Sequence, residues 1–186
     1  MTETASSLAR FAVVMPVYED QEAASRLMKN LRREYGDAVT VVAVDDGSVR
    51  HPIDAGTLDE AGIRGVVIKL RRNVGHQRAI AIGLNYVADQ MPDCPCTIVM
   101  DSDGEDTPES IRELVVPLQS PDVDVVVAAR KSRVETWRFK AFYVVYKALF
   151  QLLSGRRISF GNFMALKPFA IKRVAAMQEL WTHIAV

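Results

Sequence analysis

Cysteine is scarce in this chain, and several familiar sequence signatures are missing from it. Its 186 residues include only two cysteines, Cys94 and Cys96, which are too few for a structural zinc site. We therefore expect reduced thiols in a cytosolic setting. The sequence has no run of about 18 uncharged apolar residues, so it predicts no membrane-spanning helix. No GxGxxG pattern follows the first predicted strand, which disfavours a classical dinucleotide site, and no Walker A sequence is present.

Charge is balanced over the whole chain but unevenly distributed along it. The sequence has 23 Lys and Arg against 23 Asp and Glu, and 49% of its residues are hydrophobic, as in ordinary globular proteins. Residues 1–127 hold 12 Lys and Arg against 21 Asp and Glu, whereas residues 128–157 hold 8 against 1. This asymmetry predicts an acidic half that binds a cation and a basic segment that faces an anionic partner.

Buried strands and amphipathic helices alternate along the first 130 residues. Apolar runs predict strands at residues 11–17, 39–44, 65–70, 97–100 and 123–129. Helical spacing predicts helices that begin near residues 19, 51, 76 and 108, with Glu19, Asp20 and Glu22 in the first turn of the first one. This alternation predicts an α/β fold, in which a mostly parallel sheet carries helices on both faces. Loops that follow parallel strands meet at one edge, so Tyr18, Asp45, Asp101 and Arg130 should converge.

The densest cluster of carboxylates is the loop DSDGED at residues 101–106. It follows the predicted strand 97–100, and Thr107 and Pro108 are typical of the helix start that comes next. Asp101 and Asp103 present two oxygens to a hard cation, and Mg²⁺ or Mn²⁺ commonly combines a few carboxylates with ligand phosphates. The loop therefore predicts a divalent-cation site, with a solvated acidic turn as the alternative.

A basic segment rich in aromatic residues follows Arg130. Its apolar positions have the spacing of one amphipathic helix stripe: Phe139, Phe142, Tyr143, Tyr146, Leu149, Phe150 and Leu153. The stripe fits a helix packed on the sheet, and it also fits an interfacial helix with its cations toward lipid head groups. Residues 159–167 are predicted to form an edge strand, and Pro168 to begin a last helix. The chain stops at Val186 without a terminating signal, so we expect a fragment of a longer protein.

Four sequence blocks resemble one enzyme family in order and spacing. They are VVMPVYED at 13–20, VVAVDDGS at 41–48, RRNVGHQRAIAIGLNYV at 71–87 and IVMDSDGEDTPESI at 98–111. Together they resemble the family 2 glycosyltransferases of GT-A fold. The segment RKSR at 130–133, followed by the aromatic helix, is most similar to the polyprenyl-phosphate glycosyltransferases, the dolichol-phosphate mannose synthase and bactoprenol glucosyltransferase group. The resemblance covers about residues 10–175.

The resemblance assigns roles to particular positions. It implies a nucleotide-sugar-binding core at residues 1–130 and an acceptor-side part at residues 131–186. Substrate-binding positions are Pro16, Tyr18, Asp20, Asp45, Asp101, Ser102, Arg130 and Arg133. The implied metal ligands for Mg²⁺ or Mn²⁺ are Asp101, Asp103 and Glu105, and the implied catalytic residues are Asp103 and Arg130.

Three departures from the family pattern affect these assignments. Glu105 stands where the lipid-directed branch usually has Gln, which adds a charge and could alter metal affinity. Asn162 stands where a GDF-like motif often has Asp. The membrane-spanning C-terminal helices of many bacterial relatives are absent from these 186 residues. A Q-x-x-R-W motif is also missing, which disfavours the processive polysaccharide synthases.

The resemblance implies inverting, metal-dependent transfer of a sugar from a nucleoside-diphosphate sugar to a polyprenyl phosphate. The other implied partner is a membrane surface, reached through residues 131–157 on the cytoplasmic side, peripherally or through anchoring segments outside this chain. We expect no nucleic-acid partner, and the chain could form a homo-oligomer. Two alternatives stay open: a saccharide or protein hydroxyl as acceptor, and a nucleotide-sugar-binding module without turnover. A phosphotransfer receiver domain is disfavoured by the DxD block.

Overall fold

One mixed sheet with helices on both faces organises the chain. The structure, a computed structural model, describes residues 10–129 and 160–177. The strands are β1 (Phe11–Val17), β2 (Val39–Asp45), β3 (Arg64–Lys69), β4 (Thr97–Val99), β5 (Val125–Ala129) and β6 (Phe160–Leu166). The helices are α1 (Gln21–Tyr35), α2 (Ala55–Ala61), α3 (His76–Gln90), α4 (Ile111–Leu118) and α6 (Pro168–Ala175), with 3₁₀ turns at Gly36–Ala38 and Pro108–Ser110. These elements confirm the predicted α/β alternation.

Two predicted helix starts were too early, because side-chain caps decide where α1 and α2 begin. Asp20 is the N-cap of α1, and its Oδ1 accepts from the backbone N–H of Ala23 at 3.3 Å. Glu19 therefore lies before the helix rather than in its first turn. Asp54 caps α2 by a capping box with Thr57, so that helix begins at Ala55 rather than near residue 51.

The strand order is β3-β2-β1-β4-β6-β5, and every strand except β6 runs in one direction. β6 pairs antiparallel with β4 on one side and with β5 on the other. The prediction that residues 159–167 form an edge strand was therefore wrong, since β5 is the edge. The physical reason is visible in β6, whose consecutive residues Phe163 to Leu166 are all buried, as expected for an internal strand.

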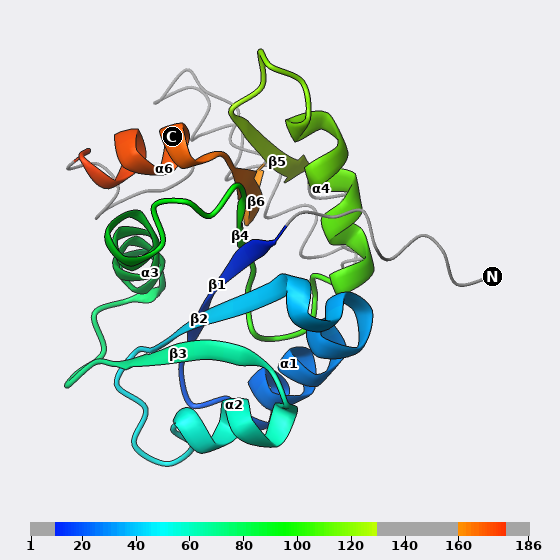
Figure 1. Cartoon of the computed structure of the whole chain (residues 1–186). Coiled ribbons are helices and arrows are strands. Elements are labelled where there is room, and N and C mark those ends of the chain that lie inside the picture. The colour runs from blue at the N-terminus through cyan, green and yellow to red at the C-terminus, as the bar shows by residue number, and fades with distance from the viewer. Residues whose placement is uncertain (1–9, 130–159, 178–186) are drawn as a thin grey trace, which may run out of the picture.

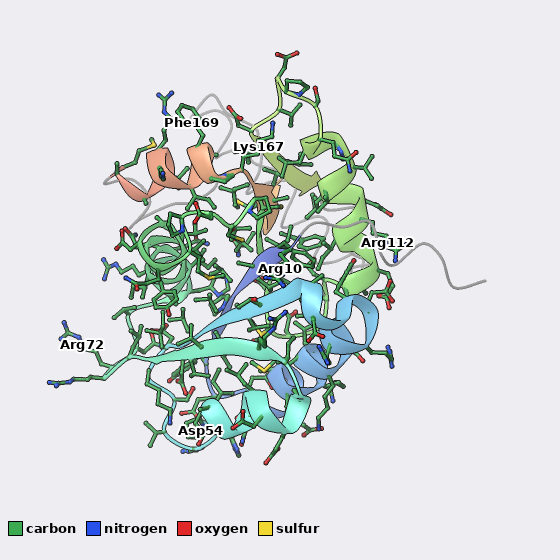
Figure 2. The ribbon with its side chains drawn as sticks, in the orientation of Figure 1. Arg10, Asp54, Arg72, Arg112, Lys167 and Phe169 are labelled. Atoms are coloured by element: carbon green, nitrogen blue, oxygen red, sulfur yellow. The ribbon has the colours of Figure 1, made fainter. Side chains whose placement is uncertain are left out.

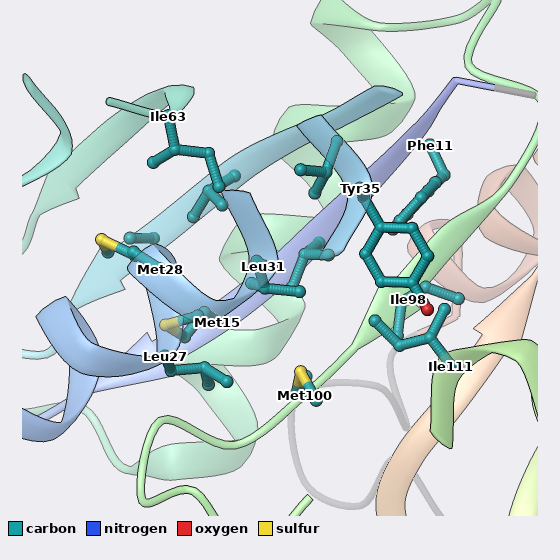
Figure 3. Packing of buried hydrophobic residues seen from close by; sticks show 14 of the residues in the cluster. Phe11, Met15, Leu27, Met28, Leu31, Tyr35, Ile63, Ile98, Met100 and Ile111 are labelled. Atoms are coloured by element: carbon teal, nitrogen blue, oxygen red, sulfur yellow. The ribbon is translucent and has the colours of Figure 1, made fainter. Parts of the chain in front are cut away.

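The two faces of the sheet are covered by different helices (Figure 1). On one face, α1, α2 and α4 enclose a cluster that includes Met15, Leu31 and Ile98. Figure 3 shows the close packing of this cluster around Tyr35 and Ile111. On the other face, residues of α3 and α6 pack on alternate strand positions: Ala12, Val14, Val42 and Val99. Each fully buried Leu, Ile or Met contributes about 1.5–3 kcal/mol, so this double burial stabilises the scaffold under the loops.

α3 packs closely against β1 at Gly83. A Cβ built on Gly83 would come within 2.5 Å of Val14 Cγ1, so a larger residue there would push the helix away. Among the residues the structure describes, no helix has both the length and the apolar character needed to cross a bilayer. Residues 131–157, with the predicted amphipathic helix and Arg133, lie outside the described residues, as does Arg130.

Candidate functional site

A cleft opens where the parallel strands end at their carboxyl edge. β1 lies between β2 and β4, so the chain leaves β1 toward one side and later returns to its other side. In open α/β sheets this reversal creates a crevice beyond the strand ends in which ligands bind. The cleft has a volume of about 420 Å³. It is lined by Pro16, Val17, Tyr18, Asp20, Asp46, Asn73, His76, Asp101, Ser102 and Asp103.

Most of the predicted site residues that the structure describes meet in this cleft. Pro16 lies near the end of β1, and the others come from two loops far apart in sequence, after β1 and after β4: Tyr18, Asp20, Asp101, Ser102 and Asp103. Asp45 and Glu105 do not line it. The domain boundary at residue 130 stays a prediction, although β6, beyond that boundary, belongs to the same sheet as β1.

The loop after β1 presents an exposed aromatic ring beside an ordered turn. Tyr18 is 54% exposed, although it follows a strand in which every residue is buried. Glu19 adopts a left-handed conformation with φ of +52°, which is uncommon for a residue with a side chain. Its carboxylate accepts from the backbone N–H groups of Val49 at 2.7 Å and His51 at 2.9 Å. These hydrogen bonds, the largest cause, lower the pKa of Glu19 and tie the loop after β1 to the loop after β2.

Both aspartates after β2 accept hydrogen bonds from backbone N–H groups. Asp45 is 2% exposed, and its carboxylate accepts from Ser48 N at 2.8 Å and from Ile53 N at 3.0 Å. Asp46 is 3% exposed and accepts from Val74 N at 2.7 Å and Gly75 N at 3.0 Å. Asp45 thus organises its own loop, whereas Asp46 holds the loop before α3 against the cleft.

Asp101 and Asp103, in the acidic loop after β4, accept fewer hydrogen bonds than the aspartates after β2. Asp103 is exposed, and its Oδ1 accepts one hydrogen bond, from Glu105 N at 2.8 Å, within a turn that Gly104 completes at φ of +81°. Asp101 is 17% exposed at its side chain, and its Oδ1 lies 3.1 Å from Nε2 of His76. No donor among the described residues meets that buried Oδ1 with hydrogen-bond geometry, and the contact is an ion pair only when the His76 ring is protonated.

His76, the first residue of α3, joins the acidic loop to β6. The polar contact with Asp101 is the largest cause of a raised pKa of the imidazole, against which partial burial of the ring acts. Nδ2 of Asn162 lies 2.9 Å from the same ring nitrogen, and Nε2 of Gln77 donates to Oδ1 of Asn162 at 3.0 Å. Positive charge on His76 would therefore lie among the acids of the cleft.

The acids after β4 fit a divalent cation that a ligand helps to hold. Within residues 10–129 and 160–177, no three His, Cys, Asp or Glu side chains are grouped so that they could hold a metal ion. Asp101 nevertheless offers a buried oxygen without a hydrogen-bond donor, and Asp103 an exposed carboxylate. Such a pair suits Mg²⁺ or Mn²⁺, which take oxygen ligands and share their coordination with substrate phosphates. Glu105 as a third ligand stays a prediction.

Four residues that line the cleft are missing from the site predicted from the sequence: Val17, Asp46, Asn73 and His76. Asp46 directly follows β2, and this position at the end of a parallel strand was the signal that could have identified it. The block RRNVGHQ contains both Asn73 and His76, and its position after a parallel strand was the signal that could have identified them.

Comparisons with known proteins identify the family and the fold of this chain. The family model described as glycosyl transferase family 2 matches residues 12–181. The undecaprenyl-phosphate 4-deoxy-4-formamido-L-arabinose transferase of Edwardsiella ictaluri is 30% identical over 184 residues, which cover 94% of this chain and 54% of that protein. The enzyme of the same name from Sodalis glossinidius is 28% identical over 82% of this chain and 47% of its own length. The chain thus spans about half the length of these curated relatives.

Solved structures share the fold at low sequence identity. A mannosyltransferase from Pyrobaculum calidifontis, in complex with GDP-Man and Mn²⁺, superposes with a TM-score of 0.60 at 15% identity, over 91% of this chain and 48% of that one. Glucosyl-3-phosphoglycerate synthase from Mycobacterium tuberculosis, with Mn²⁺, UDP-glucose and phosphoglyceric acid, gives 0.58 at 16% identity, over 90% and 60%. The sheet is therefore that of the GT-A glycosyltransferases, and the chain belongs to glycosyl transferase family 2.

Proposed function

We propose that this chain binds a nucleoside-diphosphate sugar together with Mg²⁺ or Mn²⁺ and transfers the sugar, with inversion, to a polyprenyl phosphate. The observation that carries the proposal is the convergence of Tyr18, Asp20, Asp46, Asp101 and Asp103 on one cleft at the switch point of the sheet. The names of the curated relatives support a polyprenyl phosphate as acceptor. The ligands named with the solved neighbours support a nucleotide sugar and a divalent cation.

The charge of the cleft explains why a cation is needed. A diphosphate is an anion, and the acids that line the cleft would repel it in a medium of reduced dielectric constant. A divalent cation held by Asp101 and Asp103 would supply Lewis-acid stabilisation to the leaving diphosphate. The N-terminal end of α3 adds a partial positive charge at the wall formed by His76.

The remaining residues suit the nucleoside part of the donor. The exposed Tyr18 ring offers a flat apolar surface for a base, and Asp20 lies in the same wall as a hydrogen-bond acceptor for a ribose hydroxyl. Asp45 contributes in a different way, because its carboxylate orders the loop beside that wall. We retain Arg130 and Arg133 as candidates for contacts to the diphosphate or to the acceptor phosphate.

The identity of the acceptor decides whether the reaction needs a base. A lipid phosphate is already anionic at neutral pH and can attack the anomeric carbon directly, while a hydroxyl acceptor must lose a proton to a carboxylate. The eight Lys and Arg of residues 128–157 favour the anionic acceptor and a peripheral membrane position. A small anionic acceptor is the second candidate, favoured by the phosphoglyceric acid named with one solved neighbour.

The first test is Asp103→Ala in the full chain. Calorimetric titration with UDP and with GDP should show Mn²⁺-stimulated binding in the wild type and at least about a tenfold loss of that stimulation in the variant, since the carboxylate is an assigned ligand. Asp122→Ala, on the loop before β5, is the matched control and should bind like the wild type. Unchanged metal-dependent affinity in Asp103→Ala would contradict the proposal.

Transfer assays separate the two acceptor candidates. Radiolabelled UDP-glucose and GDP-mannose should be tested with undecaprenyl phosphate in detergent and with phosphoglyceric acid in buffer. Transfer to the lipid alone would support the polyprenyl acceptor, and transfer to the soluble acid alone would overturn it. Nucleotide binding without transfer to either acceptor would favour a binding module.

A further inference from the structure

The register of β6 brings a residue distant in sequence to the acidic loop. β4 and β6 are antiparallel, with Val99 opposite Met164 and Ile98 opposite Ala165. Continuing this register by two residues places Asn162 at the level of Asp101. Because β6 runs against the other strands, its N-terminal end lies at the edge where the parallel strands terminate and the cleft opens. An internal strand thus delivers an amide side chain next to the proposed cation site.

Both polar atoms of the Asn162 side chain contact the first two residues of α3. Gln77 Nε2 donates to Asn162 Oδ1 at 3.0 Å, and Asn162 Nδ2 lies 2.9 Å from Nε2 of His76. That ring nitrogen also lies 3.1 Å from Oδ1 of Asp101. The imidazole is therefore held between an amide on β6 and a carboxylate on the loop after β4.

An amide suits this place better than a carboxylate would. A side-chain amide has a donor and an acceptor. Nδ2 of Asn162 donates to His76 Nε2 when that nitrogen is unprotonated, and the amide must turn Oδ1 toward the ring when Nε2 carries the proton that attracts Asp101. A carboxylate can only accept, and it would add negative charge beside Asp46, Asp101 and Asp103. Asn162 can thus hold the ring against Asp101 without increasing the repulsion that a diphosphate meets.

We propose that Asn162 is a positioning residue that acts through His76 to orient the Asp101 carboxylate. The inference rests on the proposed function, in which Asp101 serves the nucleotide sugar and its cation. It adds a structural role for a position at which the family pattern has Asp. Removing Asn162 should leave the imidazole free to turn, and the carboxylate of Asp101 should then lose its fixed orientation.

A double-mutant cycle tests this coupling. The full chain carrying Asn162→Ala, His76→Ala or both is titrated with UDP and with GDP in the presence of Mn²⁺. Each single substitution should weaken the affinity about tenfold, as loss of a residue that orients a metal ligand does. The double variant should be no weaker than His76→Ala alone, because both substitutions interrupt one chain of contacts. Losses that multiply in the double variant would overturn the inference.

Two controls exclude a merely structural effect of these substitutions. Asn85→Ala removes an amide on the same helix, one that donates to Ala81 O at 2.8 Å, and it should leave nucleotide affinity unchanged. His76→Gln should restore most of the affinity lost in His76→Ala, because one amide can donate to Asp101 and accept from Asn162 at once. No difference between the Gln and Ala variants would contradict the proposed contact chain.

A spectroscopic measurement decides the inference separately from the proposed function. Imidazole ¹⁵N–¹H correlation spectra without nucleotide should show altered His76 signals in Asn162→Ala, with His51 signals unchanged. His76→Ala assigns the signals. Unaltered His76 signals would overturn the inference even if the nucleotide binds. Absence of Mn²⁺-dependent nucleotide binding in the wild type would overturn the proposed function. Altered His76 signals in Asn162→Ala would, even then, support the contact by which Asn162 positions His76.

Discussion

The aspartates after β2 and the aspartates after β4 lie at one edge of one sheet, yet they are used differently. Asp45 and Asp46 are buried, and each accepts two hydrogen bonds from backbone N–H groups of neighbouring loops. Asp103 is exposed with one such bond, and Asp101 has a buried oxygen that no described donor reaches with hydrogen-bond geometry. The first pair builds the cleft, and the second pair is available to a ligand.

This difference shows that the number of nearby hydrogen-bond donors, more than residue type or position, distinguishes a structural aspartate from a candidate metal ligand. A carboxylate whose oxygens accept from backbone amides has few lone pairs directed at anything else. Removing it leaves buried N–H groups without partners, which costs stability. Removing a carboxylate that accepts few hydrogen bonds costs little stability, but it should abolish the binding of the ligand that this carboxylate holds.

Asp45→Ala should have the largest effect on stability. The substitution leaves the N–H groups of Ser48 and Ile53 without their acceptor, and Ile53 is fully buried. We expect the free energy of unfolding to fall by about 2–4 kcal/mol in urea titrations, from two charge-assisted hydrogen bonds. Asp103→Ala, at the exposed site, should lower it by less than about 1 kcal/mol. Equal losses of unfolding free energy in the two variants would contradict the distinction between a structural aspartate and one available to a ligand.

Gly47→Ala should have the second largest effect on stability, because Gly47 allows the loop after β2 to contact the loop after β3. Its φ is +77°, and a Cβ there would come within 2.5 Å of the backbone carbonyl carbon of Arg72. Arg72 itself extends outward from the loop after β3 (Figure 2), so the contact involves its backbone. We expect a loss of about 2–3 kcal/mol from strain and displacement, measured by thermal unfolding.

Gly36→Ala is the matched control for this substitution. Gly36 also has a positive φ, of +55°, with ψ of −127°, but nothing lies within 4 Å of the place that an added methyl group would occupy. Only the backbone penalty of about 1–3 kcal/mol therefore applies. The Gly47 variant should also bind nucleotide more weakly, since its clash displaces the loop that carries Asn73. A Gly47 variant no less stable than the Gly36 variant would argue against the close loop contact.

The contact between His76 and Asp101 should make the stability of the protein depend slightly on pH. Asp101 raises the pKa of this imidazole above its ordinary value of 6.5, so the pKa is higher in the folded chain than in the unfolded chain. The resulting stabilisation is fully present below pH 6.5 and is lost as the pH rises through the raised pKa. Because the side chain is 44% exposed, solvent screening keeps the effect small.

The measurement compares the wild type with His76→Ala in urea titrations without metal, at about pH 6 and about pH 8. The wild type should lose slightly more stability between these two pH values than the variant. An identical change in both proteins would show that the contact between Asp101 and His76 contributes no pH-dependent stability.

Much of the fold followed from local patterns. The runs of apolar residues at β1 and β2 predicted strands buried on both faces, and the clusters on the two sides of the sheet confirm this. Pro108 predicted the turn that begins the helical segment leading to α4. The place of β6 could not be predicted in this way, because its apolar run fits an edge strand as well as an internal one until its pairing partners are known.

The sequence by itself determined which side chains follow the strands, and hence that Tyr18 and Asp101 would meet at one edge of the sheet. Parallel strands necessarily bring their following loops to one edge. Only the tertiary structure decided that Asp45 turns inward to backbone amides and that Asn162 reaches His76, 86 residues away in sequence. These outcomes depend on strand register and on which donors the neighbouring loops present, and residues so far apart in sequence carry no local pattern that reveals either.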